Sequence, residues 1–354
     1  MKILLIRLRL IGDVVFTTPI PRAVKRAFPG ARVSYLVEQA AAPVVSHNPH
    51  IDEVIVVRRR RGWRRVADDV ALARRLRRAR YDVVIDLHGG PRSSWLAWAS
   101  GARQRIGYDV KGRSWMYTRT VGRPRELRAR HSVVNQWDLL DALEGWPGTA
   151  PDPARDAVEM APDPAVVGAI ARRLAEAGIE DSHELVVAHV SAGNPFRRWP
   201  EPAFTEVLAR IAETSDRRRV IVSSGPSDRE AAARITAAAR ERLGAAGPRI
   251  VDFGEFGLAE LRELIVRSRV FIGGDTGPLH IAGAVGTPLV ALFGPTYPER
   301  NGPWSSRDVV ISRVSECSCL YERRCRTSTP CINDITMQQA VDGVRRMLTS
   351  SGRS

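Results

Sequence analysis

The chain has 354 residues, which is long enough for two domains of ordinary size. No apolar run approaches the ~20 residues that a membrane-spanning helix needs. The apolar start is interrupted by Arg7 and Arg9, so we interpret it as a first strand and expect a cytoplasmic protein. Lys and Arg outnumber Asp and Glu by 54 to 39, a net charge of +15. This balance implies an anionic partner, namely a nucleic acid, an acidic membrane surface or a polyanionic substrate, and the excess of Arg over Lys also fits arginine-rich codon usage.

The first 150 residues alternate short apolar strands with helices. We predict strands at 2–8, 33–37, 51–57 and 82–87, and helices at 19–28 and 66–79. This alternation is typical of a parallel sheet with helices on both faces. Asp13 follows the first strand on a turn that contains Gly12, and open α/β sheets bind ligands at such turns. Capping of the next helix is an equally good local interpretation of Asp13, and the lack of a G-x-G-x-x-G pattern weakens a dinucleotide-binding interpretation.

Residues 58–80 form the most basic stretch of the chain. Eleven arginines fall in it, at 58–61, 64, 65, 74, 75, 77, 78 and 80. A charge run of this kind is usually a solvated helix face. Guanidinium groups suit bidentate contact with phosphate and Trp63 suits a membrane interface, so here the density of charge favours contact with an acidic surface.

Turn-forming residues at 145–153 predict a linker, after which a second domain repeats the pattern. We predict strands at 185–190, 219–224, 249–253, 270–272 and 289–293, and helices at 164–178, 202–214, 228–243, 258–268, 279–285 and 336–348. The loop 191–200 follows a strand, is small and polar and holds two arginines. Such a loop is typical of a phosphate site.

The stretch 270–298 reads as a strand, a glycine-rich turn, a helix and a second buried strand. Thr276 and Gly277 put backbone N–H groups at the start of the helix, where an anion is favoured, and Gly277 lets a phosphate approach the backbone closely. Asp275 lies at the carboxyl end of the strand, and His280 lies one helical turn on, so both can face one ligand. An ordinary capped turn is the alternative interpretation.

All four cysteines lie within fifteen residues, at Cys317, Cys319, Cys325 and Cys331. Disulfides are disfavoured in the cytoplasm, so clustered thiols indicate a structural metal ion, commonly zinc. The spacing C-x-C-x5-C-x5-C differs from the usual paired C-x2-C arrangement. Reduced cysteines that only pack against each other are therefore the alternative.

Four segments occur in an order and spacing that are more specific together than alone. They are Gly-Asp-x-x-x-x-Thr-x-Pro at 12–19, Asp-Leu-His-Gly at 86–89, Arg-x-Trp-Pro at 197–200, and Asp-Thr-Gly-x-x-His at 275–280 followed by Leu-Phe-Gly-Pro-Thr at 292–296. With them, nearly the whole chain resembles glycosyltransferase family 9, the ADP-heptose:lipopolysaccharide heptosyltransferases. The resemblance implies an α/β protein of the GT-B fold, with two Rossmann-like doubly wound domains facing a central cleft. The acceptor-binding domain would span 1–150 and the nucleotide-sugar domain 151–333, with a helix at 334–354 that packs back on the first domain.

The resemblance also implies a role for each matching residue. Asp13 would be the general base, and Gly12, His88 and Arg92 would bind the acceptor. The donor would be bound by Ser191, Arg197, Asp228, Asp275, Thr276, Gly277 and His280. Three residues depart from the family pattern: His88 stands where glutamine is usual, Arg197 where lysine is usual, and Asp228 where the longer glutamate is commoner.

The implied reaction is inverting transfer of a heptose or related sugar from an ADP-sugar, without a catalytic metal, to an anionic, lipid-linked glycan such as the lipopolysaccharide core. The enzyme would then act at the inner face of the inner membrane as a peripheral protein. Two alternatives stay open: a GT-B transferase or epimerase that uses another nucleotide sugar, and a nucleic-acid-binding protein. Nucleic acid is the weaker alternative, because only 6% of the residues are aromatic and no nucleic-acid-binding motif is present.

Overall fold

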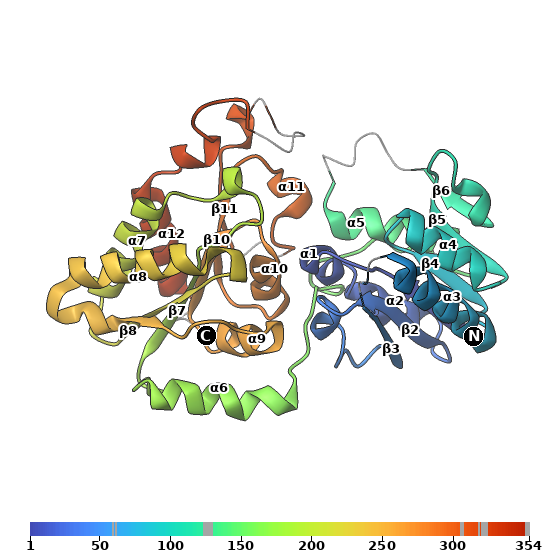
Figure 1. The fold of residues 1–354 in the computed structure, drawn as a ribbon, viewed down its shortest axis with the longest axis horizontal. Helices are drawn as coiled ribbons and strands as arrows, with labels where there is room; N and C mark the ends of the chain where they lie inside the picture. Colours follow the sequence, from blue (N-terminus) through green and yellow to red (C-terminus); the bar gives the residue numbers. More distant parts are fainter. Residues whose placement is uncertain are drawn as a thin grey trace. The chain divides into compact units, whose positions relative to one another are not determined.

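The computed structural model describes residues 1–58, 60, 62–122, 130–304, 308–317, 319 and 325–350. The chain divides into two compact units, Met1–Ala161 and Pro162–Ser354 (Figure 1). The division lies beyond the predicted linker at 145–153, so residues 151–161 belong to the first unit and not to the second.

The first unit is a parallel sheet in the order β3-β2-β1-β4-β5-β6, with helices on both faces (Figure 1). Its strands are β1 Lys2–Ile6, β2 Arg32–Glu38, β3 Glu53–Val57, β4 Val83–Asp86, β5 Gln104–Tyr108 and β6 Arg119–Val121. Its helices are α1 Ile11–Val15, α2 Pro19–Ala27, α3 Gly62–Ala79, α4 Pro91–Ala99 and α5 Ser132–Trp137, with 3-10 turns η1 Ala42–Val44, η2 Ser114–Met116 and η3 Asp138–Ala142.

The second unit repeats this topology, in the order β12-β11-β10-β7-β8-β9. Its strands are β7 Glu184–His189, β8 Arg218–Ser223, β9 Ile250–Asp252, β10 Val270–Gly274, β11 Leu289–Phe293 and β12 Val309–Ser312. Its helices are α6 Pro164–Glu176, α7 Glu201–Glu213, α8 Arg229–Leu243, α9 Leu258–Val266, α10 Gly277–Ala284, α11 Pro298–Asn301 and α12 Met337–Ser350. The 3-10 turns are η4 Pro195–Arg197, η5 Pro226–Asp228, η6 Gly244–Arg249, η7 Val314–Glu316 and η8 Cys331–Asp334.

The central strands of both sheets are buried on both faces, which explains their continuous apolar sequences. In β1 the side chains Ile3 to Ile6 have no exposed surface, and β11 is buried throughout. The alternation of strands and helices and the parallel sheets expected from the sequence are therefore confirmed.

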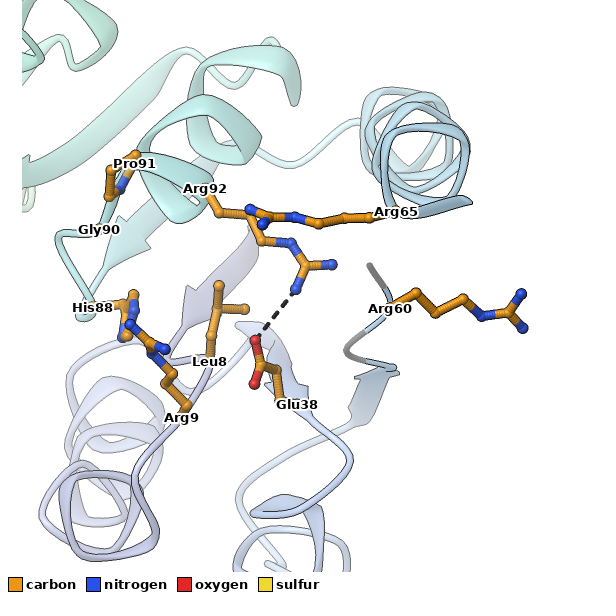
Figure 2. A pocket seen from close by; sticks show the side chains of 9 residues that line it. All are labelled: Leu8, Arg9, Glu38, Arg60, Arg65, His88, Gly90, Pro91 and Arg92. Carbon is orange, nitrogen blue, oxygen red and sulfur yellow. Dashed lines mark hydrogen bonds and ion pairs between the residues drawn. The ribbon is translucent and has the colours of Figure 1, made fainter. Parts of the chain in front are cut away.

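The order of strands in each sheet defines one switch point, where the chain turns from building one half of the sheet to building the other. It lies between β1 and β4 in the first unit, and between β7 and β10 in the second. Open α/β sheets bind ligands outside the carboxyl ends of the strands at such points. Residues that follow β1 and β4 line a pocket there (Figure 2).

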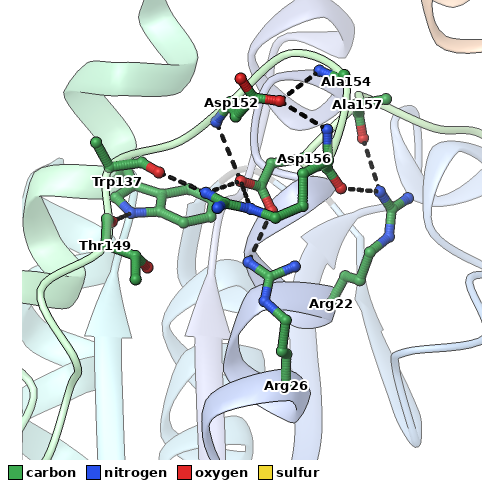
Figure 3. Close-up of polar contacts among 10 residues, drawn as sticks. Arg22, Arg26, Trp137, Thr149, Asp152, Ala154, Asp156 and Ala157 are labelled. Carbon is green, nitrogen blue, oxygen red and sulfur yellow. Dashed lines mark hydrogen bonds and ion pairs between the residues drawn. The ribbon is translucent and has the colours of Figure 1, made fainter.

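Ion pairs bind residues 152–159, just before the boundary, to helix α2 of the first unit (Figure 3). Asp156 has no exposed surface, and its carboxylate pairs with Arg26 on α2 at 2.8 Å and with Arg155 at 2.8 Å. Arg22, one turn earlier on α2, pairs with Glu159. These contacts bind Asp156 and Glu159, which follow the turn-forming residues, to α2.

The C-terminal helix differs from expectation. We expected it to pack on the first unit, but α12 packs on α7 and β11 of the second unit. Its residues Ala340, Val341, Val344 and Met347 are buried in the core of that unit. The apolar face of the helix is buried in this contact. A sequence pattern can show that a helix has an apolar face, but it does not show which element that face packs against.

Candidate functional site

Asp13 lies at the first switch point and is held by an arginine. It is the third residue of α1, and its carboxylate forms an ion pair with Arg7, which follows β1. Arg7 is 8% exposed and also donates from Nη1 to the carbonyl oxygen of Leu87, which follows β4. Leu10, not Asp13, occupies the N-cap of α1, so capping does not explain the aspartate. Leu10 has φ of 65°, a strained value for leucine in a turn next to a candidate catalytic group.

His88 and Gly90 follow β4 and line a pocket of about 210 Å³ (Figure 2). Arg9, Arg60 and Arg65 are among the other residues that line it. Burial, followed by the charges of Arg7 and Arg9, lowers the pKa of His88 to about 4, so the ring is neutral at physiological pH. Its Nδ1 is buried and has no hydrogen-bond partner among the described residues. The pocket therefore offers cationic groups and one neutral imidazole to an anionic ligand.

Arg92 lines the same pocket, but its guanidinium is already engaged. It donates to Asp69 of α3 at 2.6 and 2.9 Å and to Glu38 at the end of β2 at 3.3 Å. The side chain is 12% exposed. Arg92 thus ties α3 and β2 to α4, a geometry that does not favour its predicted contact with the acceptor. Arg105 on β5 donates to the carbonyl oxygens of Ala102 and Met116.

The arginine run is only partly available to a ligand. Arg59 and Arg61 lie outside the described residues. Arg60 pairs with Asp68 at 3.2 Å and Arg65 with Asp69 at 3.6 Å. Trp63 is 75% exposed at the start of α3. Among the described residues of this run, exposed charge and an exposed indole therefore lie together at the first turns of α3 beside the pocket.

The second switch point brings three predicted residues together. The Asp275 carboxylate, which follows β10, lies 3.3 Å from Nε2 of His280 on α10 and 3.7 Å from Nη1 of Arg197 in the turn after β7. Burial alone would raise the pKa of Asp275, but the hydrogen bond and charge of His280, the charge of Arg197 and a hydrogen bond from Thr296 together lower it. A buried carboxylate that stays ionised therefore faces the start of α10, where Thr276 is the N-cap and Gly277 the first helical residue.

Two further donor-site predictions lie on neighbouring loops. The Ser191 hydroxyl accepts from the backbone N–H of Gly225 at 2.7 Å and so joins the loops after β7 and β8. Asp228 is 3% exposed and pairs with Arg198 at 2.5 Å. The sequence did not predict a separate role for Arg198. Its position next to Arg197 in the same polar loop is the feature that could have indicated one.

A sequence profile of glycosyltransferase family 9 (heptosyltransferase) matches residues 70–331. The chain belongs to glycosyltransferase family 9. The family 9 relatives include lipopolysaccharide heptosyltransferase 3 of Escherichia coli, 27% identical over 84% of this chain and 85% of that protein. They also include lipopolysaccharide heptosyltransferase 1 of Pseudomonas aeruginosa PAO1, 27% identical over 92% and 87%.

Solved structures confirm the fold of this family 9 enzyme. A family 9 glycosyltransferase from Veillonella parvula superposes with a TM-score of 0.87 at 22% identity, covering 99% of this chain and 97% of that one. ADP-heptose lipopolysaccharide heptosyltransferase II of Escherichia coli superposes with a TM-score of 0.79 at 20% identity, covering 99% and 100%. The chain is therefore a glycosyltransferase with two doubly wound α/β units, as in GT-B enzymes. No helix in the described residues is both long and apolar enough to cross a membrane.

The four cysteines lie in the second unit as reduced thiols. Sγ of Cys319 is 3.8 Å from that of Cys317 and 3.5 Å from that of Cys325. Among the described residues, no group of three or more His, Cys, Asp or Glu side chains is arranged to hold a metal ion. The zinc site thus stays a prediction, which the metal content of the purified protein would test.

Proposed function

We propose that this family 9 enzyme transfers a heptose from ADP-heptose to a phosphorylated, lipid-linked glycan of the lipopolysaccharide core. One observation carries the proposal. Each switch point holds a carboxylate beside an arginine, and the surroundings of the two pairs suit different substrates. Asp13 is 29% exposed and so accessible to an acceptor hydroxyl, whereas Asp275 is 9% exposed and lies where backbone N–H groups favour an anion.

The proposed reaction is a single displacement with inversion. Asp13 accepts the proton of an acceptor hydroxyl. The hydroxyl oxygen attacks the anomeric carbon as the bond from that carbon to the diphosphate breaks, and ADP leaves with the bonding electrons. Arg197 and the N–H groups around Thr276 and Gly277 stabilise the charge that develops on the diphosphate, so no step needs a metal ion. Asp275, held by His280, accepts a hydrogen bond from a sugar or ribose hydroxyl.

The nucleoside contact is assigned to the loops after β7 and β8. We propose that Ser191 and Asp228 bind the nucleoside of the donor, with Arg198 holding Asp228 in place. The ion pair at 2.5 Å supports this arrangement because a buried carboxylate needs a cation or several donors. Arg197 in place of the usual lysine keeps the charge at the diphosphate and adds a planar fork of donors.

The acceptor is assigned to the pocket of the first unit. Arg9, Arg60 and Arg65 provide charge for acceptor phosphate groups, and His88 provides a neutral hydrogen-bonding ring. The exposed Trp63 and the arginines at the start of α3 support peripheral contact of this surface with an acidic membrane, at the inner face of the inner membrane.

The test is release of ADP and formation of glycosylated product from ADP-heptose and heptose-deficient lipopolysaccharide. We expect Asp13→Asn to lower kcat by at least about 100-fold while donor binding is unchanged, since a general base contributes roughly 10²–10⁴. Asp141→Asn, an exposed carboxylate on η3, is the matched control and should keep full activity.

Donor identity is tested by calorimetry with ADP-heptose, ADP, UDP-sugars and GDP-sugars, on the wild type and on Asp275→Ala. Selective binding of ADP compounds that is lost in the variant supports the proposal. Preference for a UDP- or GDP-sugar would keep glycosyl transfer and correct the donor. Epimerisation of the sugar without any acceptor, or binding of none of these compounds, would contradict the proposed reaction.

A further inference from the structure

The turn that carries His88 is built around a buried carboxyl group. Asp86 is the last residue of β4 and has no exposed surface. Its Oδ1 accepts from the backbone N–H groups of His88 and Gly89, both at 2.9 Å. Its Oδ2 lies 2.6 Å from the hydroxyl oxygen of Tyr117, which follows η2. The carboxyl group therefore joins β4, the pocket turn and a distant tyrosine.

The hydroxyl contacts continue from Tyr117 back to the turn. The Tyr117 oxygen lies 2.7 Å from Oγ of Ser94, and Oγ of Ser94 lies 2.8 Å from the carbonyl oxygen of Gly90. The result is a chain of three short oxygen–oxygen contacts, from Asp86 through Tyr117 and Ser94 to Gly90. Ser93, next along α4, donates to the same Gly90 carbonyl at 2.9 Å and accepts from the Gly90 N–H at 3.0 Å.

The protons in this chain can be counted. A carbonyl oxygen supplies no proton, so an ionised Asp86 leaves only the protons of Tyr117 and Ser94 for three contacts. A neutral Asp86 adds a third. Asp86 then donates to Tyr117, Tyr117 donates to Ser94, and Ser94 donates to Gly90. Only the neutral state gives every contact its proton, and a contact without one costs free energy in a buried site.

A charge on Asp86 would be isolated. Among the residues that the structure describes, no Lys, Arg or His forms an ion pair with it. The charged side chains on the surrounding elements have other partners: Arg7 pairs with Asp13, Arg92 pairs with Asp69, and Arg105 donates to backbone carbonyl oxygens. His88 is uncharged, and the charge of Arg113 lowers the pKa of Tyr117. An isolated buried carboxylate takes up a proton in preference to staying charged. Burial accordingly raises the pKa of Asp86 and outweighs the hydrogen bonds from Tyr117, Gly89 and His88, which lower it.

We propose that Asp86 keeps its proton in the folded protein and acts as a positioning residue, with its neutral carboxyl group and Tyr117 fixing the turn that presents His88 to the pocket. A carboxylic acid that is kept neutral serves as a hydrogen-bond donor. A neutral group also adds no negative charge beneath a pocket that Arg9, Arg60 and Arg65 line together with Glu38. The consequence for the acceptor rests on the proposed function, whereas the protonation of Asp86 does not.

The decisive variant is Asp86→Asn, because an asparagine side chain has nearly the shape of the neutral acid and, like it, is uncharged and offers both an acceptor and a donor. Its oxygen accepts from His88 and Gly89, and its nitrogen donates to Tyr117. We expect the variant to unfold at the same urea concentration as the wild type at pH 7 or at a higher one. Tyr117→Phe breaks the chain and should unfold at a clearly lower concentration. Destabilisation by Asp86→Asn as large as that of Tyr117→Phe would overturn the proposal, since it would show that the charge is needed.

Two measurements report the proton itself. Infrared difference spectra of wild type minus Asp86→Asn should contain the carbonyl band of a protonated carboxylic acid at pH 7, and a carboxylate band in its place would refute the proposal. A raised folded-state pKa gives stability that is present below the unfolded pKa and lost as pH rises through the folded pKa. The wild type should therefore lose stability relative to Asp86→Asn as pH rises, and an unchanged difference would count against the proposal.

The effect on the pocket is read from acceptor kinetics. Asp86→Asn should change the KM for acceptor by less than about twofold. Tyr117→Phe should raise this KM with donor affinity unchanged, because it removes the hydroxyl group that joins Asp86 to Ser94. A Tyr117→Phe enzyme with normal acceptor KM would overturn the positioning role. If no acceptor is glycosylated at all, the proposed function fails, but the infrared and urea results still decide the state of Asp86.

Discussion

Replacement of Gly107 by alanine tests the core of the first unit most directly. Gly107 lies on β5, and a Cβ atom built there would be 2.3, 2.4 and 2.7 Å from Cζ, Cε1 and Cε2 of the Tyr117 ring. Carbon atoms in contact are separated by about 3.5–4.0 Å, so the ring must retreat by more than about 1 Å. The Tyr117 hydroxyl cannot then keep its contacts with Asp86 and Ser94.

The expected cost combines two effects. Overpacking a buried site costs about 1–3 kcal/mol. A buried polar group left without its partner costs about 1–3 kcal/mol more. Gly107→Ala should therefore lower the free energy of unfolding of the first unit by roughly 2–6 kcal/mol. Backbone strain contributes nothing to this figure, because Gly107 does not have a left-handed φ.

Urea unfolding measures this loss of stability. Hydrogen exchange of peptides from β4 and β5 shows whether the loss is located in the first unit. Gly30→Ala is the matched control, because a Cβ atom at Gly30 meets nothing within 4 Å. A Gly107→Ala protein as stable as the control, with unchanged exchange in β4, would show that the Tyr117 ring does not cover Gly107 and would refute the reasoning.

Three further variants test other contacts. Asp156→Asn should lower the free energy of unfolding by about 1–3 kcal/mol at pH 7, since it removes the charge of a fully buried carboxylate whose partner Arg26 is 41% exposed. Burial would raise the pKa of Asp156, but Arg155 and Arg26 lower it. The stability that the ionised carboxylate contributes is therefore present above the unfolded pKa and is lost as pH falls through the folded pKa. In urea titrations, the difference between the wild type and Asp156→Asn should shrink over the same pH range. Leu10→Gly should stabilise the protein by about 1 kcal/mol in the same titrations by relieving a strained φ, and destabilisation would contradict that origin. His280→Ala should weaken ADP-sugar binding in calorimetry by about tenfold because the Asp275 carboxylate loses its donor, and unchanged affinity would remove Asp275 from the donor site.

Much of the fold could be predicted because its central strands are apolar runs between turn formers. The strand predicted at 289–293 coincides with β11, and the helix predicted at 258–268 covers α9 Leu258–Val266. Burial on both faces makes such strands continuous in hydrophobicity, so their ends are marked by the change to turn residues.

The elements that were missed lie away from this pattern. β5 Gln104–Tyr108 and β6 Arg119–Val121 form one side of their sheet, with polar residues in both, and β12 Val309–Ser312 is the edge strand of the other sheet. α4 Pro91–Ala99 begins with Pro-Arg-Ser-Ser and has no clear apolar face in its sequence. Whether such segments form strands depends on the neighbouring strands with which they pair. A local sequence pattern does not contain that information.

The sequence predicted where the residues of the candidate site lie in the fold, but not which side chains they contact. The turns after β1, β4, β7 and β10 are marked by glycine and polar residues in the sequence, and the structure places them at the two switch points. Which cation meets which carboxylate depends on side chains far apart in the chain. Arg92 was expected to meet a ligand and is engaged by Glu38 and Asp69, 54 and 23 residues away.

The two switch points differ in how tightly their arginines are held, and this difference assigns them different tasks. Arg7 is 8% exposed and is bound by both Asp13 and the Leu87 carbonyl, so it is fixed before any substrate arrives. Arg197 has a side chain that is 33% exposed, and it approaches Asp275 only at 3.7 Å. A loosely held, exposed guanidinium is the one that a diphosphate can recruit. Arg7→Lys should therefore change kcat through Asp13 and leave donor affinity intact, whereas Arg197→Lys should change donor affinity, and calorimetry with ADP separates the two.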